Sequence, residues 1–190
     1  MEVISVNKKY VKLIEFIHHG NRENAVKRAI ELLDKKEITI IDLYETVLTP
    51  ALYAIDCAEG DKECIWKEHI SSSIVRTILE LTYPYILKEK QETLKEKVLV
   101  VCPTEEYHEL GAKMAHDFFL LEGFDSTFIG ANTPLQVILD ACEFVKPDYI
   151  AISVTNYYHI IDAKKVIDEI KKNYPNIKIL AGGQAFNDPK

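Results

Sequence analysis

The sequence of 190 residues lacks an excess of basic charge, a long apolar run and a leader-like N-terminus. Its formal net charge is −7, whereas non-specific nucleic-acid binding requires a basic surface, so direct nucleic-acid contact is not expected. No stretch approaches the roughly 20 apolar residues that cross a membrane. The first residues contain no apolar core followed by a small-residue cleavage site, so no secretory signal is expected. These absences predict a cytoplasmic protein without membrane contact.

The sequence also lacks the spacings that mark metal, redox and phosphate sites. Its four cysteines form no C-x-x-C pair and stand at Cys57, Cys64, Cys102 and Cys142. Scattered cysteines fit a reducing compartment better than a disulfide framework or a zinc site, so unpaired thiols are predicted. There is also no nucleophile–base pair and no phosphate loop, so an independent enzyme is not predicted.

Helical periodicity runs through the first ninety residues. An apolar stripe that includes Leu13 and Ile17 ends near Gly20, where a glycine can stop a helix. Further amphipathic stretches follow, and Pro50 is expected to kink or split one of them. Four or five helices with short connections predict a small bundle over residues 1–90.

The period changes after a charged linker at residues 91–97. Short runs rich in β-branched residues then alternate with helical patterns over residues 98–190. This alternation predicts an α/β domain with a doubly wound parallel sheet of the Rossmann or flavodoxin type. Strands are expected at 98–102, 126–130, 148–154 and 177–183, with helices at 108–123, 134–145 and 160–174.

Polar residues and glycines stand at the expected carboxyl ends of the strands, where ligands bind in such sheets. His108 follows the first strand and suits a base, a metal ligand or a pH switch, although an exposed loop histidine is the simpler interpretation. Glu106 can accept the other imidazole N–H, and Gly111 lets a bulky group come close. Glu109 suits the first turn of the following helix.

Three further strand ends carry candidate residues. Ser153 and Thr155 end the third strand with hydroxyl groups, which taken singly is ordinary strand-end chemistry. Gly182 and Gly183 end the fourth strand and either leave backbone open to a ligand or form a tight turn. The segment "GANTP" supplies Gly130 as a gap in the wall, and Thr133 is its expected helix N-cap.

Taken together, E-x-H-x-x-G at 106–111, S-x-T at 153–155 and G-G at 182–183 resemble the signature of the cobalamin-binding domain family. The resemblance implies that His108 binds cobalt from below and that Glu106 is its hydrogen-bond partner. It also implies a slot for the dimethylbenzimidazole tail, lined by Ser153, Gly182 and Gly183. The other residues implied at the cofactor are Tyr107, Glu109, Leu110, Gly111, Gly130 and Thr155.

The helical half resembles the bundle that caps the upper face of the corrin in the same family, so the likeness extends from about Ile41 onward. Glu68 and His69 match a motif of sensor-type members, which bind adenosylcobalamin and use light to break its cobalt–carbon bond. In those members a tryptophan precedes this pair by nine intervening residues, a position that falls on Ala58 here. Trp66 is expected in the bundle core. His69 is either an upper-face histidine or a partner of Glu68 on a solvated helix face.

Two features differ from the sensors that the sequence resembles. Family members continue for about a strand and a helix after G-G, whereas this sequence stops seven residues after Gly183, so a sheet that is short at its C-terminus is expected. The N-terminal helices are acidic to neutral and too few to form a DNA-binding helix-turn-helix beside the cap.

Three functions follow from the resemblance. The first is a corrinoid-binding sensor that holds cobalamin base-off, as adenosylcobalamin or methylcobalamin, with His108 on cobalt. Its response to ligand or light would be read by a protein partner or through a homo-oligomer. The second is a corrinoid carrier that serves a methyltransferase, with Glu106 managing the proton of the histidine. The third is an interaction module that has lost the cofactor.

Overall fold

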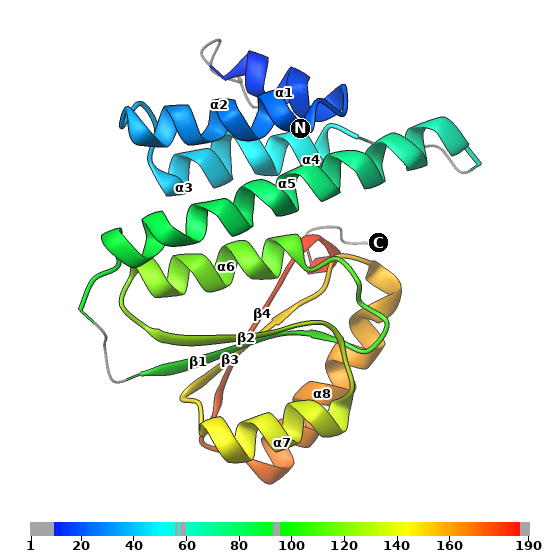
Figure 1. Ribbon diagram of the computed structural model, residues 1–190. Coiled ribbons are helices and arrows are strands. Elements are labelled where there is room, and N and C mark those ends of the chain that lie inside the picture. Colours follow the sequence, from blue (N-terminus) through cyan, green and yellow to red (C-terminus); the bar gives the residue numbers. More distant parts are fainter. Residues whose placement is uncertain (1–9, 56, 58–59, 93–95, 187–190) are drawn as a thin grey trace. The chain divides into compact units, whose positions relative to one another are not determined.

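The computed structural model describes residues 10–55, 57, 60–92 and 96–186. Ala58, at the expected tryptophan position of the sensors, lies outside these residues. The chain divides into two compact units, Met1–Lys88 and Glu89–Lys190, and each is described by itself (Figure 1). None of the helices in the described ranges combines the length and the apolar character of a membrane span.

The first unit is helical, as predicted. Its α-helices are α1 (Val11–His18), α2 (Arg22–Asp34), α3 (Ile40–Leu43), α4 (Thr49–Tyr53) and α5 (Lys62–Glu89). The stripe of α1 is buried at Leu13 and Ile17, and the helix ends shortly before Gly20. Asn21 caps α2, because its side chain accepts a hydrogen bond from the backbone N–H of Asn24 at 3.2 Å.

The predicted break at Pro50 is confirmed. Between α3 and α4 the chain makes a π-helical turn at Tyr44–Leu48, and Pro50 stands in the first turn of α4. Proline has no N–H to donate, so the regular ladder of a single long helix would be interrupted here. Tyr44 nevertheless stays fully buried, and its hydroxyl hydrogen-bonds to Thr82 of α5.

The prediction that Trp66 lies in the bundle core is wrong. Trp66 is 63% exposed on α5. The buried stripe of α5 begins at Ser71 and continues through Ile74, Val75 and Ile78. Trp66 precedes Ser71 by five residues, which turns it about 140° away from that stripe at 3.6 residues per turn. Helical spacing alone therefore does not decide which side of this helix is buried.

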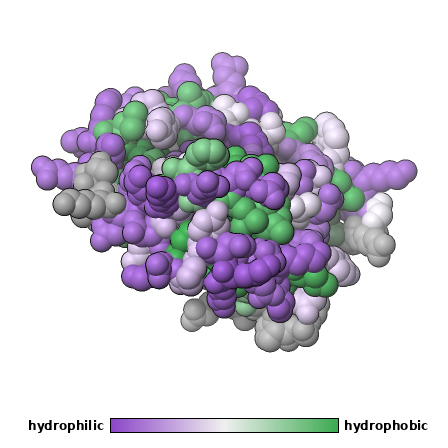
Figure 2. All heavy atoms as spheres, turned by 90° about the horizontal axis from the view of Figure 1, so that it is seen from below, coloured by the Kyte–Doolittle hydropathy of each residue, from purple (hydrophilic) through white to green (hydrophobic). Residues whose placement is uncertain are grey.

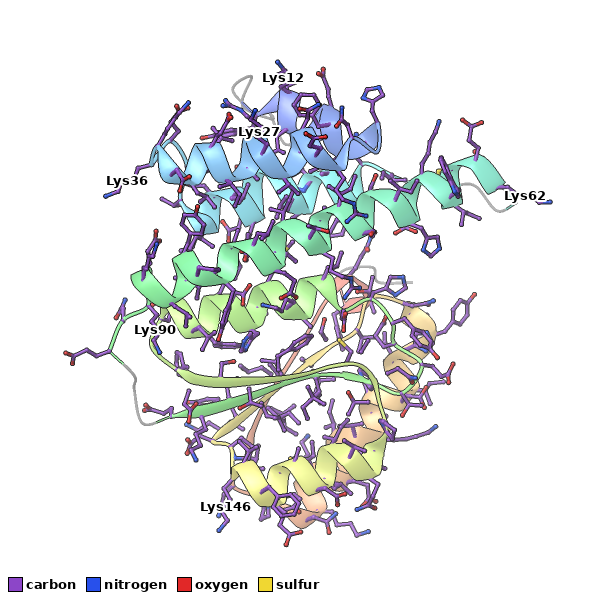
Figure 3. The ribbon with its side chains drawn as sticks, in the orientation of Figure 1. Lys12, Lys27, Lys36, Lys62, Lys90 and Lys146 are labelled. Carbon is purple, nitrogen blue, oxygen red and sulfur yellow. A yellow bond between two sulfur atoms is a disulfide. The ribbon has the colours of Figure 1, made fainter. Side chains whose placement is uncertain are left out.

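The prediction of four unpaired cysteines is also wrong. Cys57 and Cys64 form a disulfide with their Cα atoms 5.5 Å apart, while Cys102 and Cys142 are free and buried. The seven-residue separation brings the start of α5 back beside Cys57, a spacing that a search for C-x-x-C does not detect. Lys62, labelled in Figure 3, marks this end of α5.

The second unit is the predicted doubly wound α/β domain. Its elements alternate as β1 (Lys97–Pro103), α6 (Leu110–Leu121), β2 (Asp125–Thr133), α7 (Leu135–Val145), β3 (Tyr149–Ser153), α8 (Ile160–Asn173) and β4 (Lys178–Gly182). The strands are parallel, in the order β2-β1-β3-β4. Helix α6 covers one face of the sheet, and α7 and α8 cover the other (Figure 1). Viewed from the side of α7 and α8, the surface is mostly hydrophilic with scattered apolar side chains (Figure 2).

Two apolar clusters, one on each face of the sheet, hold the α/β unit together. Alternate residues of β1 face opposite sides, so Val98 and Val100 pack with Ala112 of α6, whereas Leu99 and Val101 pack toward α7 and α8. At the carboxyl edge the register pairs Pro103 with Thr133 and Ser153 with Gly182. Because all strands are parallel, the loops that follow them meet at this one edge.

One detail of this edge differs from the prediction. Pro134, not Thr133, is the N-cap residue of α7. The Thr133 hydroxyl instead donates a hydrogen bond to the carbonyl oxygen of Gly130 at 3.1 Å. The side chain therefore stabilises the end of β2, not the start of the helix.

Candidate functional site

The loop between β1 and α6 presents His108 beside a buried carboxylate. Glu106 is fully buried. Its Oε1 accepts hydrogen bonds from His108 Nδ1 at 2.6 Å and from the backbone N–H of His108 at 2.9 Å. Its Oε2 accepts from the backbone N–H groups of Thr155 at 2.8 Å and of Asn156 at 3.0 Å. All four lone-pair positions of this carboxylate therefore have donors.

These hydrogen bonds fix the charge of Glu106. Burial alone would raise its pKa, but the bonds from His108, Asn156 and Thr155 outweigh this and lower the pKa to about 2. The group is then an anion at neutral pH and can only accept from the imidazole. In the neutral ring the proton accordingly lies on Nδ1, and the lone pair lies on Nε2.

The His108 side chain is 59% exposed, so its ring is accessible from solvent. Among the described residues no three His, Cys, Asp or Glu side chains are grouped so that they could hold a metal ion. A single imidazole donor suits a metal ion whose other coordination positions are occupied by ligands that do not come from the protein. An outer carboxylate that orients the ring and raises its basicity is typical of metal-binding histidines.

Further hydrogen bonds join the loop after β1 to the end of β2. Glu109 Oε2 accepts from the backbone N–H of Ala131 at 3.0 Å, so this carboxylate is a link between two strand ends. Asn132 contributes twice: its Oδ1 accepts from the Glu105 N–H at 2.9 Å, and its own N–H donates to the Glu106 carbonyl at 2.8 Å. The structure thus gives Glu109 a structural role, in addition to its position just before α6.

Asn132 and Asn156 are the site residues that the sequence reasoning missed. Asn132 lies in the segment "GANTP" and Asn156 directly follows Thr155. Asn132 has a positive φ of 48°, a conformation that asparagine tolerates. Asn156 donates to Glu106 through its backbone, and its Oδ1 accepts from the Tyr158 N–H at 3.1 Å. The feature of the sequence that could have identified them is an asparagine in each of two loops at the carboxyl edge of the sheet.

The four predicted glycines fall into two kinds. Gly130 and Gly183 have φ of 118° and 108°, and a Cβ on Gly183 would collide with the backbone of Val154, so the fold itself requires Gly183. Gly111 and Gly182 have ordinary φ, and a Cβ on either would meet nothing within 4 Å. Nothing in the described chain fills the space beside these two residues, which leaves room for a bound group.

The remaining candidates of this unit lie around His108 and Gly182. Ser153 ends β3 opposite Gly182 and is half-buried. Thr155 acts through its backbone N–H on Glu106, so its side chain is not what the structure uses there. Tyr107 is 61% exposed next to His108, and Leu110 is half-buried at the first position of α6.

Cys102 is buried at the end of β1, next to the loop that carries His108, and its thiol is unreactive. Its Sγ is 3.9 Å from the carbonyl oxygen of His108, which it meets as a weak donor. Burial raises the pKa of the Cys102 thiol to about 12, with help from the charges of Glu106 and Glu109. The thiol therefore remains protonated and is not a metal ligand in competition with His108.

Glu68 and His69 lie on α5 of the helical unit. Glu68 Oε1 accepts from the Ser72 hydroxyl at 2.8 Å, which orients the carboxylate. His69 Nε2 is 4.0 Å from Glu68 Oε2, and the His69 side chain is 77% exposed. The arrangement suits either a solvated pair or an exposed histidine that meets a ligand.

The described surface has hollows elsewhere, away from His108. One is lined by Cys142, Lys146, Tyr174 and Pro175 at the opposite end of the sheet. The other is in the helical unit at the start of α5. Neither hollow is lined by His108, Glu106 or the residues at the carboxyl ends of β2, β3 and β4.

A doubly wound domain that presents one oriented imidazole at the carboxyl edge of its sheet belongs to the class of cofactor-binding α/β domains. Residues 96–189 match the family model of the B12 binding domain, and the α/β unit belongs to this family. The prediction of a cobalamin-binding family, made from three strand-end motifs, is confirmed.

Known relatives include a regulator and a corrinoid protein. The chain is 24% identical over 117 residues to the HTH-type transcriptional repressor CarA of Myxococcus xanthus, covering 62% of this chain and 40% of that protein. It therefore spans less than half the length of this curated relative. The structure of the monomethylamine corrinoid protein of Methanosarcina barkeri matches with a TM-score of 0.74 and 17% identity, over 92% of this chain and 83% of that chain. This second likeness shows a shared fold.

Proposed function

We propose that this protein is a corrinoid-binding sensor module that holds cobalamin base-off, with His108 Nε2 on cobalt. The observation that carries the proposal is the pairing of exposed His108 with buried Glu106. The carboxylate holds the proton on Nδ1 and so keeps the Nε2 lone pair directed to a metal. Residues 98–190 would be the cofactor domain, joined by a linker at 91–97 to a helical cap at 1–90.

The open strip beside β4 supports a base-off tail. Gly182 has room for a Cβ that it does not carry, and half-buried Ser153 lies opposite it in the sheet. A flat heterocycle needs such a gap, and a hydroxyl can hydrogen-bond to its nitrogen. Gly111 offers similar room at the start of α6, while Tyr107, Leu110, Gly130 and Thr155 complete the proposed lower contacts.

The helical unit supplies candidates for the other face of the corrin. Glu68 and His69 carry the motif of sensor-type members, and exposed Trp66 lies one turn before His69 on α5. A bound alkylcobalamin supplies a cobalt–carbon bond that light can break. With adenosylcobalamin or methylcobalamin as cofactor, we propose that loss of the upper ligand changes the contacts of these side chains.

A sensor needs a partner that reads its state. The likeness to a transcriptional repressor supports a protein partner or a change of homo-oligomer as the output, in the cytoplasm. The net charge of −7 disfavours non-specific DNA binding by this chain, so we propose that the partner contacts any nucleic acid.

A methyl carrier is the second candidate. In a carrier the histidine leaves and rejoins the metal, and the Glu106 anion, which accepts from His108 Nδ1, would manage the proton that the released imidazole takes up. The features that favour the sensor are E-x-H-x-x-G at 106–111 and the Glu68–His69 pair on the helical unit.

The test is corrinoid binding by purified protein in the dark. Hydroxocobalamin, methylcobalamin or adenosylcobalamin should stay with the protein through gel filtration and show a base-off, histidine-ligated spectrum. With the cobalt reduced to Co(II), electron paramagnetic resonance should show one axial nitrogen. Labelling the protein histidines with ¹⁵N should change that splitting, because the donor is His108 and not the tail base.

His108→Ala is the key variant, and Glu105→Gln, at an exposed position of the same loop, is its matched control. We expect His108→Ala to lose the protein-nitrogen splitting while Glu105→Gln keeps it. Retention of no cobalamin would refute both corrinoid functions and leave an interaction module. Binding with no response of spectrum or oligomer to illumination would refute the light sensor, and methylation of the reduced corrinoid by a partner methyltransferase would support the carrier.

A further inference from the structure

The disulfide of the helical unit plays no part in the proposed function. Cys57 and Cys64 are bonded, and both are partly accessible to solvent. Disulfides in reducing compartments are uncommon and are usually transient or redox-sensing. We propose that this pair is a reversible thiol–disulfide exchange site that reacts with low-molecular-weight thiols and dithiol proteins. The proposal does not depend on corrinoid binding.

The other two cysteines are separated from this chemistry. Cys102 and Cys142 belong to the α/β unit and are buried. Burial raises the pKa of Cys102 to about 12 and that of Cys142 to about 11. Both thiols therefore contain little thiolate at neutral pH and neither attacks the disulfide. Exchange is confined to Cys57 and Cys64.

The surroundings of Cys64 suit an exchange reaction. Cys64 lies in the first turn of the 28-residue helix α5, and its N–H donates to Asp61 Oδ1 at 3.0 Å. The N-terminal end of a helix stabilises a thiolate, which makes Cys64 the better leaving group. The carboxylates of Asp61 and Glu63 oppose this, and the charge of Glu63 is offset by Lys67 at 2.6 Å. Cys64 and Lys67 also line a surface hollow, which gives the departing Cys64 thiolate access to solvent beside a cation.

The reaction proceeds in two balanced steps. An incoming thiolate attacks the Cys57 sulfur, the Cys57–Cys64 bond breaks, and Cys64 leaves as a thiolate that takes up a proton. A second thiol of the reductant then attacks the mixed disulfide, which releases Cys57 as a thiol and forms the oxidised reductant. Two electrons pass from the two thiols to the protein disulfide. The reverse steps restore the bond.

The bond state acts on the start of α5. The disulfide ties the first turn of this helix to Cys57, so its reduction allows that turn to open more often. Trp66 lies two residues after Cys64 and is the only tryptophan of the sequence. Its emission therefore reports the opening of this turn, because opening changes the surroundings of the indole.

The experiment uses the full chain without corrinoid, in glutathione buffers with an increasing oxidised fraction. Native alkylation and mass spectrometry should add two groups per chain after reduction and none after oxidation, whereas denatured, reduced protein should take four. Cys102 and Cys142 are 0% and 1% exposed, which keeps both thiols from the reagent while the chain is folded. Trp66 emission should change on reduction with the same midpoint as the alkylation.

The double variant Cys57→Ser/Cys64→Ser keeps the other cysteines and serves as the reference. It should show the emission of the reduced wild type at every glutathione ratio. The proposal is overturned if the native wild type takes two groups under oxidising conditions, or if glutathione fails to reduce the bond in the folded protein. It is also overturned if the double variant responds to the buffer as the wild type does.

Discussion

Replacing Glu106 by glutamine tests the central claim that a fixed anion orients His108. Glutamine has the same size but only one acceptor oxygen, and its amide group donates. If the glutamine oxygen faces Thr155 and Asn156, its NH2 group faces the Nδ1–H and the backbone N–H of His108. In the opposite orientation the NH2 group faces the backbone N–H groups of Thr155 and Asn156. In either orientation two N–H donors that had an acceptor now face the NH2 group, which can only donate.

The cost follows from the hydrogen bonds. Each stranded donor costs about 1–3 kcal/mol, and one stays stranded even after His108 moves its proton, so Glu106→Gln should destabilise the α/β unit by about 1–3 kcal/mol and lower its Tm by roughly 5–15 °C. In the first orientation His108 relieves the conflict by moving its proton to Nε2, which blocks that nitrogen as a metal ligand. We therefore expect corrinoid affinity to fall about 10- to 100-fold.

The pH dependence gives a second readout. The pKa of Glu106 is lowered from the ordinary 4.5 to about 2, so its contribution to stability is complete above pH 4.5 and is lost as the pH falls toward 2. The difference corresponds to about 3 kcal/mol. Denaturant unfolding of the wild type should show this loss between the two values. In Glu106→Gln the component should be absent.

Glu105→Gln is the matched control, because it makes the same chemical change one residue earlier at an exposed position. It should unfold and bind as the wild type does. If Glu106→Gln has wild-type stability, acid sensitivity and corrinoid affinity, the carboxylate does not orient the histidine and the reasoning fails.

Three further changes test other parts of the structure. Gly183→Ala should destabilise the α/β unit by roughly 3 kcal/mol or more in denaturant unfolding, whereas Gly182→Ala should leave stability within about 0.5 kcal/mol and speed corrinoid dissociation; equal effects on stability would contradict the distinction drawn between them. Trp66→Ala should change the free energy of unfolding by less than about 0.5 kcal/mol because the side chain is 63% exposed, and a loss of several kcal/mol would return it to the core. Reducing the Cys57–Cys64 bond, which closes a loop of eight residues, should lower the stability of the helical unit by about 2–3 kcal/mol in thermal unfolding, and an unchanged midpoint would count against a constraining role.

The sequence was sufficient for the sheet and for the edge at which the candidate residues lie. A run such as Val98–Cys102 is apolar at every position, which identifies a strand buried on both faces, and alternation with helices then requires a parallel sheet. Once the strands are parallel, the segments at His108, Ser153 and Gly182 must meet at one edge. The candidate site followed from topology before any contact was known.

Of the contacts within that edge, the hydrogen bond between His108 Nδ1 and Glu106 was predicted and is confirmed, whereas the other contacts of Glu106 could not be predicted. The two backbone donors on Glu106 Oε2 come from a loop about fifty residues away, and the route of the chain to them passes through Glu105 with a φ of 65°. Neither the long-range hydrogen bonds nor the positive φ of Glu105 can be recognised from the types of residue in the sequence. Trp66 and the Cys57–Cys64 bond were mispredicted for a related reason, because the face of a helix and the path of a short turn are chosen by tertiary packing.

The adjacent glycines at the end of β4 answer to different demands, and this offers a way to read history from sequences alone. The fold requires Gly183 whether or not a ligand is bound, whereas the space beside Gly182 matters only when a ligand occupies it. A related protein that no longer binds the cofactor could accept substitutions at Gly182 and Gly111 but not at Gly183. Comparing these three positions across related sequences would therefore separate members that still bind a corrinoid from members that keep only the fold.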